Sequence, residues 1–146
     1  MSDRTAVLAL VKSLSDVDWR VRRDAADALA KIGVPPDPNQ RLEVVSPLIR
    51  ALEDDNQALV RANAADALGG IGQPAKQSVP ALINAVNDED TWVRINVVMA
   101  LGLIKEPTDT VVTCLASTLD NADQRVRSFS LGWAVSAKQL KRRFPL

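Results

Sequence analysis

The chain has 146 residues, enough for one domain or one short array of repeats, and 47% of them are apolar, so a hydrophobic core is expected. Its 18 basic and 18 acidic residues give no net charge, which weighs against nucleic-acid binding because DNA-binding surfaces carry a basic excess. The sequence contains no histidine. Ser–His and Cys–His catalytic pairs and histidine-based zinc or iron sites are therefore excluded within this chain.

The chain carries one cysteine and no segment typical of secretion or membrane insertion. Cys114 has no partner for an intramolecular disulfide, which is typical of a reducing compartment, and its apolar surroundings favour a buried, unreactive thiol. Residues 1–16 lack the basic start and the long apolar run of a signal peptide, and no stretch approaches about 18 apolar residues. We therefore expect a cytoplasmic protein.

The first unit, residues 3–33, predicts two helices joined by an acidic turn. An apolar segment, 6–14, comes before the turn, and an amphipathic segment, 21–33, follows it. Asp18 ends the turn, where a carboxylate can accept hydrogen bonds from the free N–H groups at a helix start. Gly33 is expected to end the second helix, because glycine readily adopts the left-handed conformation found there.

The second unit, residues 43–72, repeats this arrangement. It follows a proline-rich segment, 34–41, which we interpret as a loop inserted between repeats. Its helices are expected over 44–52 and 60–72, the second again ending in glycine. Since the turn between them is one residue longer, Asn56 is the expected helix cap.

The third and fourth units, residues 76–105 and 108–138, follow at the same spacing. Their expected helices are 79–86, 93–105, 111–119 and 126–138. Asp90 and Asp123 are the expected caps of the second helices. The fourth unit is the least regular: Trp133 stands where the other units have alanine, and we interpret it as part of a terminal cap.

The last residues, 139–146, form a basic tail that includes Leu140 and Phe144. We expect the tail to continue the last helix and to dock one of these apolar side chains as a cap. Contact with an anionic partner is the alternative.

The four second helices all begin with Val-Arg. The valines are Val21, Val60, Val93 and Val126, at steps of 39, 33 and 33 residues. A fixed period in this range predicts a solenoid of stacked repeats. Ankyrin and tetratricopeptide repeats have a similar period, but they use histidine or tyrosine at fixed places and this chain has neither.

The second unit carries the most regular motif, Pro-Leu-Ile-x-Ala-Leu from Pro47 followed by Val-Arg-x-x-Ala-Ala-x-Ala-Leu-Gly-x-Ile-Gly from Val60. With this motif the chain resembles the HEAT family in its short form, the PBS-lyase HEAT-like repeat, over roughly residues 3–138. The resemblance implies an all-α fold, a right-handed α-solenoid of four two-helix repeats that forms a single domain over residues 1–146.

One face of each second helix varies between the repeats while the opposite face stays nearly constant. Counting from the valine as zero and advancing 100° per residue, the variable positions 2, 3, 6 and 10 fall between about 200° and 300°. The resemblance implies that this variable face lines the inner, concave surface of the solenoid and carries binding.

The variable face changes from charged to apolar along the array. The first two repeats place there Arg23, Asp24, Asp27, Lys31, Ala62, Asn63, Asp66 and Gly70. The last two place there Ile95, Asn96, Met99, Leu103, Ser128, Phe129, Gly132 and Ser136, with Trp92 just before the third valine. An exposed apolar patch of this kind is typical of an interaction site.

We predict a partner-binding site on this face. Its residues are Arg23, Asp27, Asn63, Asp66, Trp92, Ile95, Asn96, Met99, Leu103 and Phe129. Three alternatives remain for the apolar part: the C-terminal tail covers it, the chain self-associates through repeats three and four, or these side chains are ordinary core residues.

An arginine follows each of the four valines. These arginines are Arg22, Arg61, Arg94 and Arg127. The resemblance implies that each reaches an acidic group of the neighbouring turn, and the acidic turns favour this structural pairing over a row of phosphate-binding sites.

These observations favour a non-enzymatic scaffold or adaptor that binds another protein on its concave face. We expect no cofactor, metal, nucleic acid or membrane among its ligands. The main enzyme-related alternative comes from the resemblance, because short HEAT-like repeats occur in phycobilin lyase subunits, so the chain is alternatively a subunit or chaperone of such a system. Helical-repeat DNA-repair proteins use a basic concave face, and the first repeat here has no net charge on that face.

Overall fold

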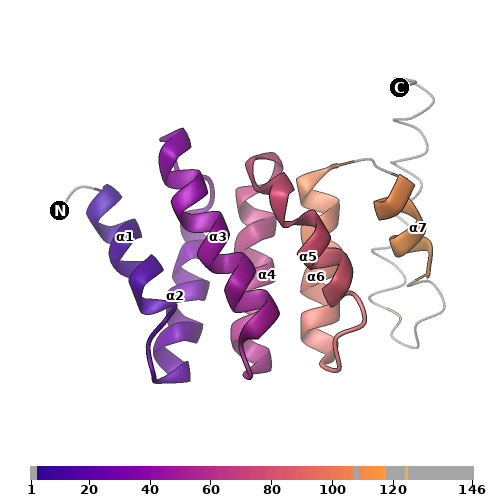
Figure 1. Cartoon of the computed structure of the whole chain (residues 1–146), viewed down its shortest axis with the longest axis horizontal. Helices are drawn as coiled ribbons and strands as arrows, with labels where there is room; N and C mark the ends of the chain where they lie inside the picture. Colours follow the sequence, from indigo (N-terminus) through magenta and orange to yellow (C-terminus); the bar gives the residue numbers. More distant parts are fainter. Residues whose placement is uncertain (1–2, 107–108, 118–123, 125–146) are drawn as a thin grey trace.

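The structure, a computed structural model, describes residues 3–106, 109–117 and 124 of the chain. Its helices stand side by side in a row of antiparallel pairs (Figure 1). The complete pairs are α1 (Asp3–Ser13) with α2 (Trp19–Ile32), α3 (Pro38–Asp54) with α4 (Ala58–Ile71), and α5 (Val79–Ala85) with α6 (Thr91–Ile104). Helix α7 (Asp109–Ser117) follows, and a 3-10 helix, η1 (Gln73–Ser78), leads into α5. The predicted all-α solenoid is confirmed.

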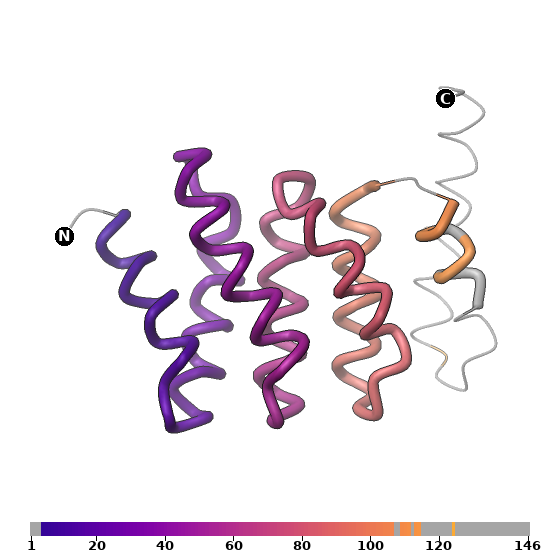
Figure 2. Tube along the Cα trace, viewed as in Figure 1, coloured from indigo at the N-terminus to yellow at the C-terminus, as the bar shows by residue number. Residues whose placement is uncertain are grey.

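The helices form two layers. The chain passes back and forth between a layer of first helices, α1, α3 and α5, and a layer of second helices, α2, α4 and α6 (Figure 2). Fully buried side chains come from both layers, among them Leu48 and Leu82 from the first and Leu68 and Leu101 from the second. The core is therefore one continuous cluster of apolar side chains between the two layers of helices. None of the described helices is both long and apolar enough to cross a membrane.

Small residues let the second helices pack closely. A Cβ atom added to Gly69 of α4 would lie only 2.9 Å from the Cα atom of Ala100 in α6. A Cβ atom on Gly70 would lie 3.3 Å from the carbonyl oxygen of Ala30 in α2. Since both neighbouring helices approach α4 at backbone distance, the row of second helices is held in a fixed register.

Helix α3 begins earlier than the sequence pattern predicted. It starts at Pro38, so part of the expected 34–41 loop is helical and the helix expected over 44–52 begins six residues earlier than predicted. The Asp37 carboxylate accepts a hydrogen bond from the N–H of Asn39 at 2.9 Å, and proline fits the first turn because its missing N–H is not needed there. Arg41 donates to the carbonyl oxygen of Pro35 at 2.8 Å and fastens the short connection that remains.

The helix caps follow the sequence prediction in two of the three described repeats. Asp18 accepts the N–H of Arg20, and Asp90 accepts the N–H groups of Trp92 and Val93. The cap expected at Asn56 is wrong: α4 begins after Gln57, whose side chain makes no capping bond. The expected cap Asp123 lies outside the described residues.

The expected glycine helix ends are confirmed. Gly33 and Gly72 have φ angles of 70° and 71°, in the region that favours glycine, and each donates its N–H back into the preceding helix. Lys105, at the end of α6, adopts the left-handed conformation without being glycine, with φ of 56°.

Candidate functional site

The asparagines at position 3 of the second helices connect neighbouring repeats. Asn63 donates from Nδ2 to the carbonyl oxygen of Arg23 at 3.3 Å, and Asn96 donates in the same way to that of Ala62 at 3.0 Å. Position 3 therefore points partly toward the preceding repeat, and position 2 lies on the side of the following one. Both asparagines are only half-exposed, so they hold the array together as well as lining its face.

Position 2 is buried in the second and third repeats, whereas Arg23, at position 2 of the first repeat, is half-exposed. Ile95 is only 4% exposed, and the equivalent Ala62 is also buried. The prediction that Ile95 lies on the open variable face is therefore wrong: at about 200° its side chain points along the row of helices instead of outward. Met99 is half-buried and packs against the same core.

The exposed apolar side chains lie nearer the middle of the variable face. Trp92 is 55% exposed and Leu103 51%, both on α6. Leu59 on α4 is 48% exposed and is not among the residues predicted from the sequence. It occupies the same place as Trp92, one residue before the valine, at about 260° on the helical wheel. From the sequence, the residue before the valine was considered only in the third repeat, and considering it in every repeat would have identified Leu59.

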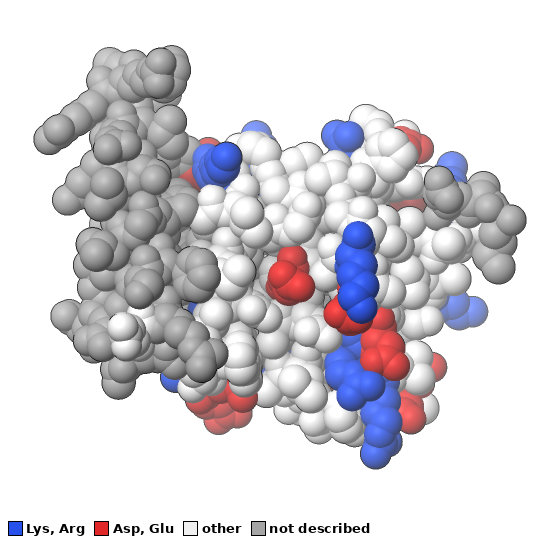
Figure 3. Space-filling view, turned by 180° about the vertical axis from the view of Figure 1, so that it is seen from behind, with Lys and Arg blue, Asp and Glu red and all other residues white. Residues whose placement is uncertain are grey.

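Charged side chains cover the first repeat. Arg23 pairs with Asp24 at 2.8 Å and Lys31 with Asp27 at 2.6 Å. The guanidinium groups of Arg20 and Arg23 also lie over the Trp19 ring, at 5.1 and 5.4 Å from its centre. Figure 3 shows charges gathered over α2, whereas the middle of this face carries one isolated acidic group.

Asp66 is the only acidic residue of α4, and it stands between the charged and the apolar part. Its side chain is exposed and makes no hydrogen bond or ion pair with the described residues. Partial burial, and then repulsion from Asp27, raise the pKa of the Asp66 carboxyl. The face thus holds one carboxylate that lacks a counter-charge.

The opposite edge of the array carries a ladder of arginine–aspartate pairs. Arg22 donates from Nε and Nη2 to both carboxylate oxygens of Asp55 at 2.6 and 3.2 Å. Arg61 binds Asp88 in the same bidentate way, at 2.9 and 3.0 Å. The predicted pairing between repeats is confirmed for these two arginines.

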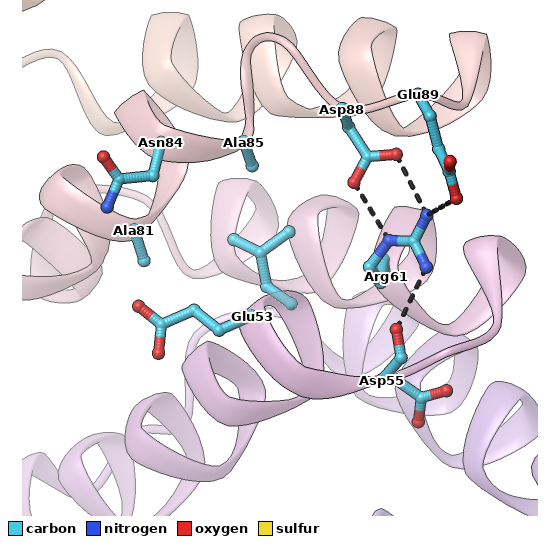
Figure 4. A pocket seen from close by; sticks show the side chains of 9 residues that line it. Glu53, Asp55, Arg61, Ala81, Asn84, Ala85, Asp88 and Glu89 are labelled. Atoms are coloured by element: carbon cyan, nitrogen blue, oxygen red, sulfur yellow. Dashed lines mark hydrogen bonds and ion pairs between the residues drawn. The ribbon is translucent and has the colours of Figure 1, made fainter.

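A groove of about 450 Å³ surrounds Arg61 (Figure 4). The guanidinium points at Asp88 and Glu89 on one side, and on the other it reaches the carbonyl oxygen of Asp55 at 3.0 Å. Burial alone would raise the pKa of the Asp88 carboxyl, but the hydrogen bonds from Arg61 outweigh it, and the pKa is lowered. Arg61 is buried, and Nε, Nη1 and Nη2 all donate hydrogen bonds within the protein. This edge therefore joins neighbouring repeats and offers no free guanidinium to a phosphate.

Arg94 donates from Nη1 to the carbonyl oxygens of Asp88 and Glu89 and from Nη2 to the hydroxyl of Thr91. Its buried Nε has no hydrogen-bond partner among the described residues, and the turn that follows α7 lies outside them. Arg127 lies outside the described residues. Across the part of the chain that the structure describes, no group of three or more acidic or cysteine side chains is placed to hold a metal ion.

Cys114 lies half-buried on α7, with Sγ 4.0 Å from the carbonyl oxygen of Ile83. Burial raises the pKa of its thiol, which fits the expected packed and unreactive side chain.

Comparison with known families matches this geometry. A family model of HEAT repeats matches residues 45–134, and the model of the PBS lyase HEAT-like repeat matches residues 21–54. The chain belongs to the HEAT-repeat family. No curated protein matches it.

Solved repeat proteins share the fold of this HEAT-repeat chain. An engineered protein is 25% identical over 91% of this chain and 62% of its own, with a TM-score of 0.74. A designed armadillo repeat protein in complex with the peptide (KR)4 is 23% identical over 91% of this chain and 64% of its own, with a TM-score of 0.73. The chain thus spans less than two thirds of the length of either relative. The complex of CpcE and CpcF of phycocyanin lyase from Nostoc sp. gives a TM-score of 0.55 at 18% identity, over 90% of this chain and 99% of that one.

The HEAT array brings most of the predicted site residues onto one face. The residues that lie on it with exposed or half-exposed side chains are Arg23, Asp27, Asn63, Asp66, Trp92, Asn96, Met99 and Leu103. Ile95 is in the core, and Phe129 lies outside the described residues, as do Ser128, Gly132, Ser136, Trp133 and the 139–146 tail.

Proposed function

We propose that this HEAT-repeat chain is a non-enzymatic scaffold that binds an extended segment of another protein across α2, α4 and α6. The observation that carries the proposal is the Asp66 carboxylate, which has no counter-charge among the described residues, on a face where α4 and α6 also expose Leu59 and Leu103. Exposed apolar side chains gathered on one face of a soluble protein usually mark an interaction site.

The spacing of the helices defines the form of the segment. Packed helices lie about 8–10 Å apart, and an extended chain advances about 3.3 Å per residue, so roughly three residues of the segment cross each helix. A lysine or arginine opposite Asp66 would therefore stand about three residues from an apolar residue opposite Leu103, and about four residues from one opposite Trp92. The designed armadillo protein, which has a similar fold, is in complex with a basic peptide, (KR)4.

Fluorescence anisotropy with three labelled eight-residue peptides tests the proposal. The first peptide is (KR)4, the second has one lysine with leucines three residues on either side of it, and the third has glutamate in place of that lysine. We expect the lysine–leucine peptide to bind more tightly, and an otherwise identical peptide with glutamate in place of lysine not to bind. The substitutions Asp66→Asn and Trp92→Ala should each weaken binding about tenfold or more, which is about 1.4 kcal/mol.

Leu42→Ala provides the matched control, because Leu42 is an exposed apolar residue of α3 in the other layer. Equal loss of binding in Leu42→Ala and Trp92→Ala, or equal affinity for the lysine and glutamate peptides, would contradict the proposal.

A second candidate function is a subunit or chaperone in a phycobilin lyase-type system. The match of residues 21–54 to the PBS lyase HEAT-like repeat favours it. A shift in the absorbance of a free bilin on addition of the chain, or of the chain with a phycobiliprotein subunit, would support this function. An unchanged spectrum in both mixtures would count against it.

A further inference from the structure

The second helices follow one another in a constant register. Asn63 of α4 donates from Nδ2 to the carbonyl oxygen of Arg23 in α2, and Asn96 of α6 donates in the same way to that of Ala62 in α4. In both bonds the asparagine holds position 3, counted from the valine, and the carbonyl belongs to position 2 of the preceding repeat. Equivalent positions of α4 and α6 therefore stand nearly level with each other, about 8–10 Å apart across the variable face.

A ligand that crosses from α4 to α6 meets equivalent positions of the two helices. Each asparagine amide has two N–H groups and uses one between helices, and neither asparagine makes another hydrogen bond with the described residues. One N–H of Asn63 and one of Asn96 are thus left for carbonyl oxygens of a ligand. Position 6 holds Asp66 on α4 and the half-buried Met99 on α6. Leu103, one turn further along α6, is 51% exposed.

The distance between the helices decides the conformation of the ligand. In a β-strand, side chains alternate between two faces, so residues on one face are about 6.7 Å or about 13 Å apart. Neither length matches the helix spacing of about 8–10 Å, and residues three apart point to opposite faces. A polyproline II helix has three residues per turn and rises about 3.1 Å per residue. Its residues three apart lie on one face, about 9.3 Å from each other, which matches the spacing.

The backbone of the ligand finds few partners on this face. A peptide that binds as a β-strand pairs its backbone with the edge of a sheet, and the described part of this chain contains helices without any strand. A polyproline II backbone stays solvated and needs no such edge. The N–H groups of Asn63 and Asn96 donate to carbonyl oxygens, which proline retains. Proline also restricts the free segment to this conformation, so less entropy is lost on binding.

We propose that the ligand of the variable face is a proline-containing segment of another protein, bound as a polyproline II helix with one contact residue per turn. This inference rests on the proposed function and specifies the class of its ligand. A basic residue of the segment contacts Asp66, and an apolar residue three positions away contacts Met99 and Leu103. The two residues between them point away from the helices, so proline fits there. Carbonyl oxygens of the segment accept from Asn63 and Asn96.

Fluorescence anisotropy of the full chain with three labelled peptides tests the inference. The first peptide is Leu-Pro-Pro-Lys-Pro-Pro-Leu. The second, Pro-Leu-Pro-Lys-Pro-Leu-Pro, has the same composition but places the leucines two residues from the lysine. The third replaces every proline of the first with alanine. All three peptides are acetylated and amidated at their ends, and each sequence is symmetrical about its lysine, so the result does not depend on the direction of binding.

We expect the first peptide to bind at least about tenfold more tightly than the second, because only its leucines lie on the same face as the lysine. The alanine peptide should bind about three- to tenfold more weakly than the first, since it loses more conformational freedom. Asp66→Asn should weaken the first peptide about tenfold. Leu42→Ala, on α3 in the other layer, is the matched control and should leave its affinity unchanged.

Two results would overturn the inference and leave the proposed function standing, provided that Asp66→Asn still weakens binding. In one, the second peptide binds as tightly as the first, which would indicate a segment with a two-residue period. In the other, the alanine peptide binds as tightly as the proline peptide or more tightly. If none of these peptides binds, and the lysine–leucine peptide without proline does not bind either, the proposed function fails and this inference fails with it.

Discussion

Arg61 donates from Nε and Nη2 to the two carboxylate oxygens of Asp88, at 2.9 and 3.0 Å, and so joins the start of α4 to the turn that leads into α6. Both side chains are nearly buried. The same arginine donates from Nη1 to the carbonyl oxygen of Asp55 in its own turn. One residue thus fixes two successive turns, which explains why an arginine stands after each valine.

Arg61→Ala should destabilise the fold by about 3 kcal/mol, because it leaves the Asp88 carboxylate buried without its counter-charge. Urea unfolding at pH 7 measures the loss. Arg50→Ala on the exposed side of α3 serves as the control and should change stability by less than about 0.5 kcal/mol. A similar loss in both variants would mean that the ion pair contributes nothing specific.

The same pair predicts how stability depends on pH. The pKa of Asp88 is lowered in the folded state, so its contribution is complete above the ordinary carboxyl pKa of about 3.9 and is lost as the pH falls through the lower, folded value. We therefore expect stability to decline below about pH 4. In Asp88→Asn this part of the decline should be absent, as urea unfolding between pH 6 and pH 3 would show.

Asp66 should behave in the opposite way. Its pKa is raised in the folded state, so the charged carboxylate costs stability at neutral pH, and this cost disappears as protonation proceeds. Asp66→Asn should then stabilise the free protein at pH 7, by less than about 1 kcal/mol because the side chain is exposed. The gain should shrink as the pH is lowered toward 4. Destabilisation at pH 7 would show that Asp66 has a structural partner.

Gly69→Ala tests the close approach of α4 and α6. Alanine favours a helix over glycine by about 1 kcal/mol, yet its Cβ would lie 2.9 Å from the Cα atom of Ala100. We expect the clash to outweigh the propensity and to destabilise by about 1–3 kcal/mol. Gly70→Ala, next to it on the exposed side, meets only the carbonyl oxygen of Ala30 and should be nearly neutral. Thermal unfolding of both variants decides the point.

Periodicity and local chemistry made much of the fold predictable. The Val-Arg spacing gives the helix pairs, and Asp18, Asp90, Gly33 and Gly72 mark helix ends through interactions within a few residues of themselves. The start of α3 was not predicted, although Asp37 and Pro38 carry the usual signal of a helix start. The longer spacing between the first two repeats led to the whole of 34–41 being assigned to an inserted loop, and the local helix-start signal within it was passed over.

The exposed residues of the variable face were predicted only in part, because a helical wheel gives the direction of a side chain and not what covers it. Ile95 and Met99 lie close together on the wheel, yet Ile95 is only 4% exposed and Met99 is half-buried. The expected cap at Asn56 failed for a related reason. Helix α4 begins at Ala58, one residue later than that cap requires, and Asp55 already binds both the N–H of Gln57 and the side chain of Arg22. Such contacts between distant residues cannot be read from one repeat alone.

Ile95 and Leu103 provide the sharpest separation of core from surface on α6. Ile95→Ala removes a buried side chain and should destabilise by about 2–5 kcal/mol, with peptide affinity unchanged once the protein is folded. Leu103→Ala removes one that is half-exposed, and should cost little stability while weakening the binding of the lysine–leucine peptide. Urea unfolding and anisotropy on the same two samples measure both quantities. If Ile95→Ala kept full stability and lost the peptide, the Ile95 side chain would belong to the peptide-binding surface and not to the core.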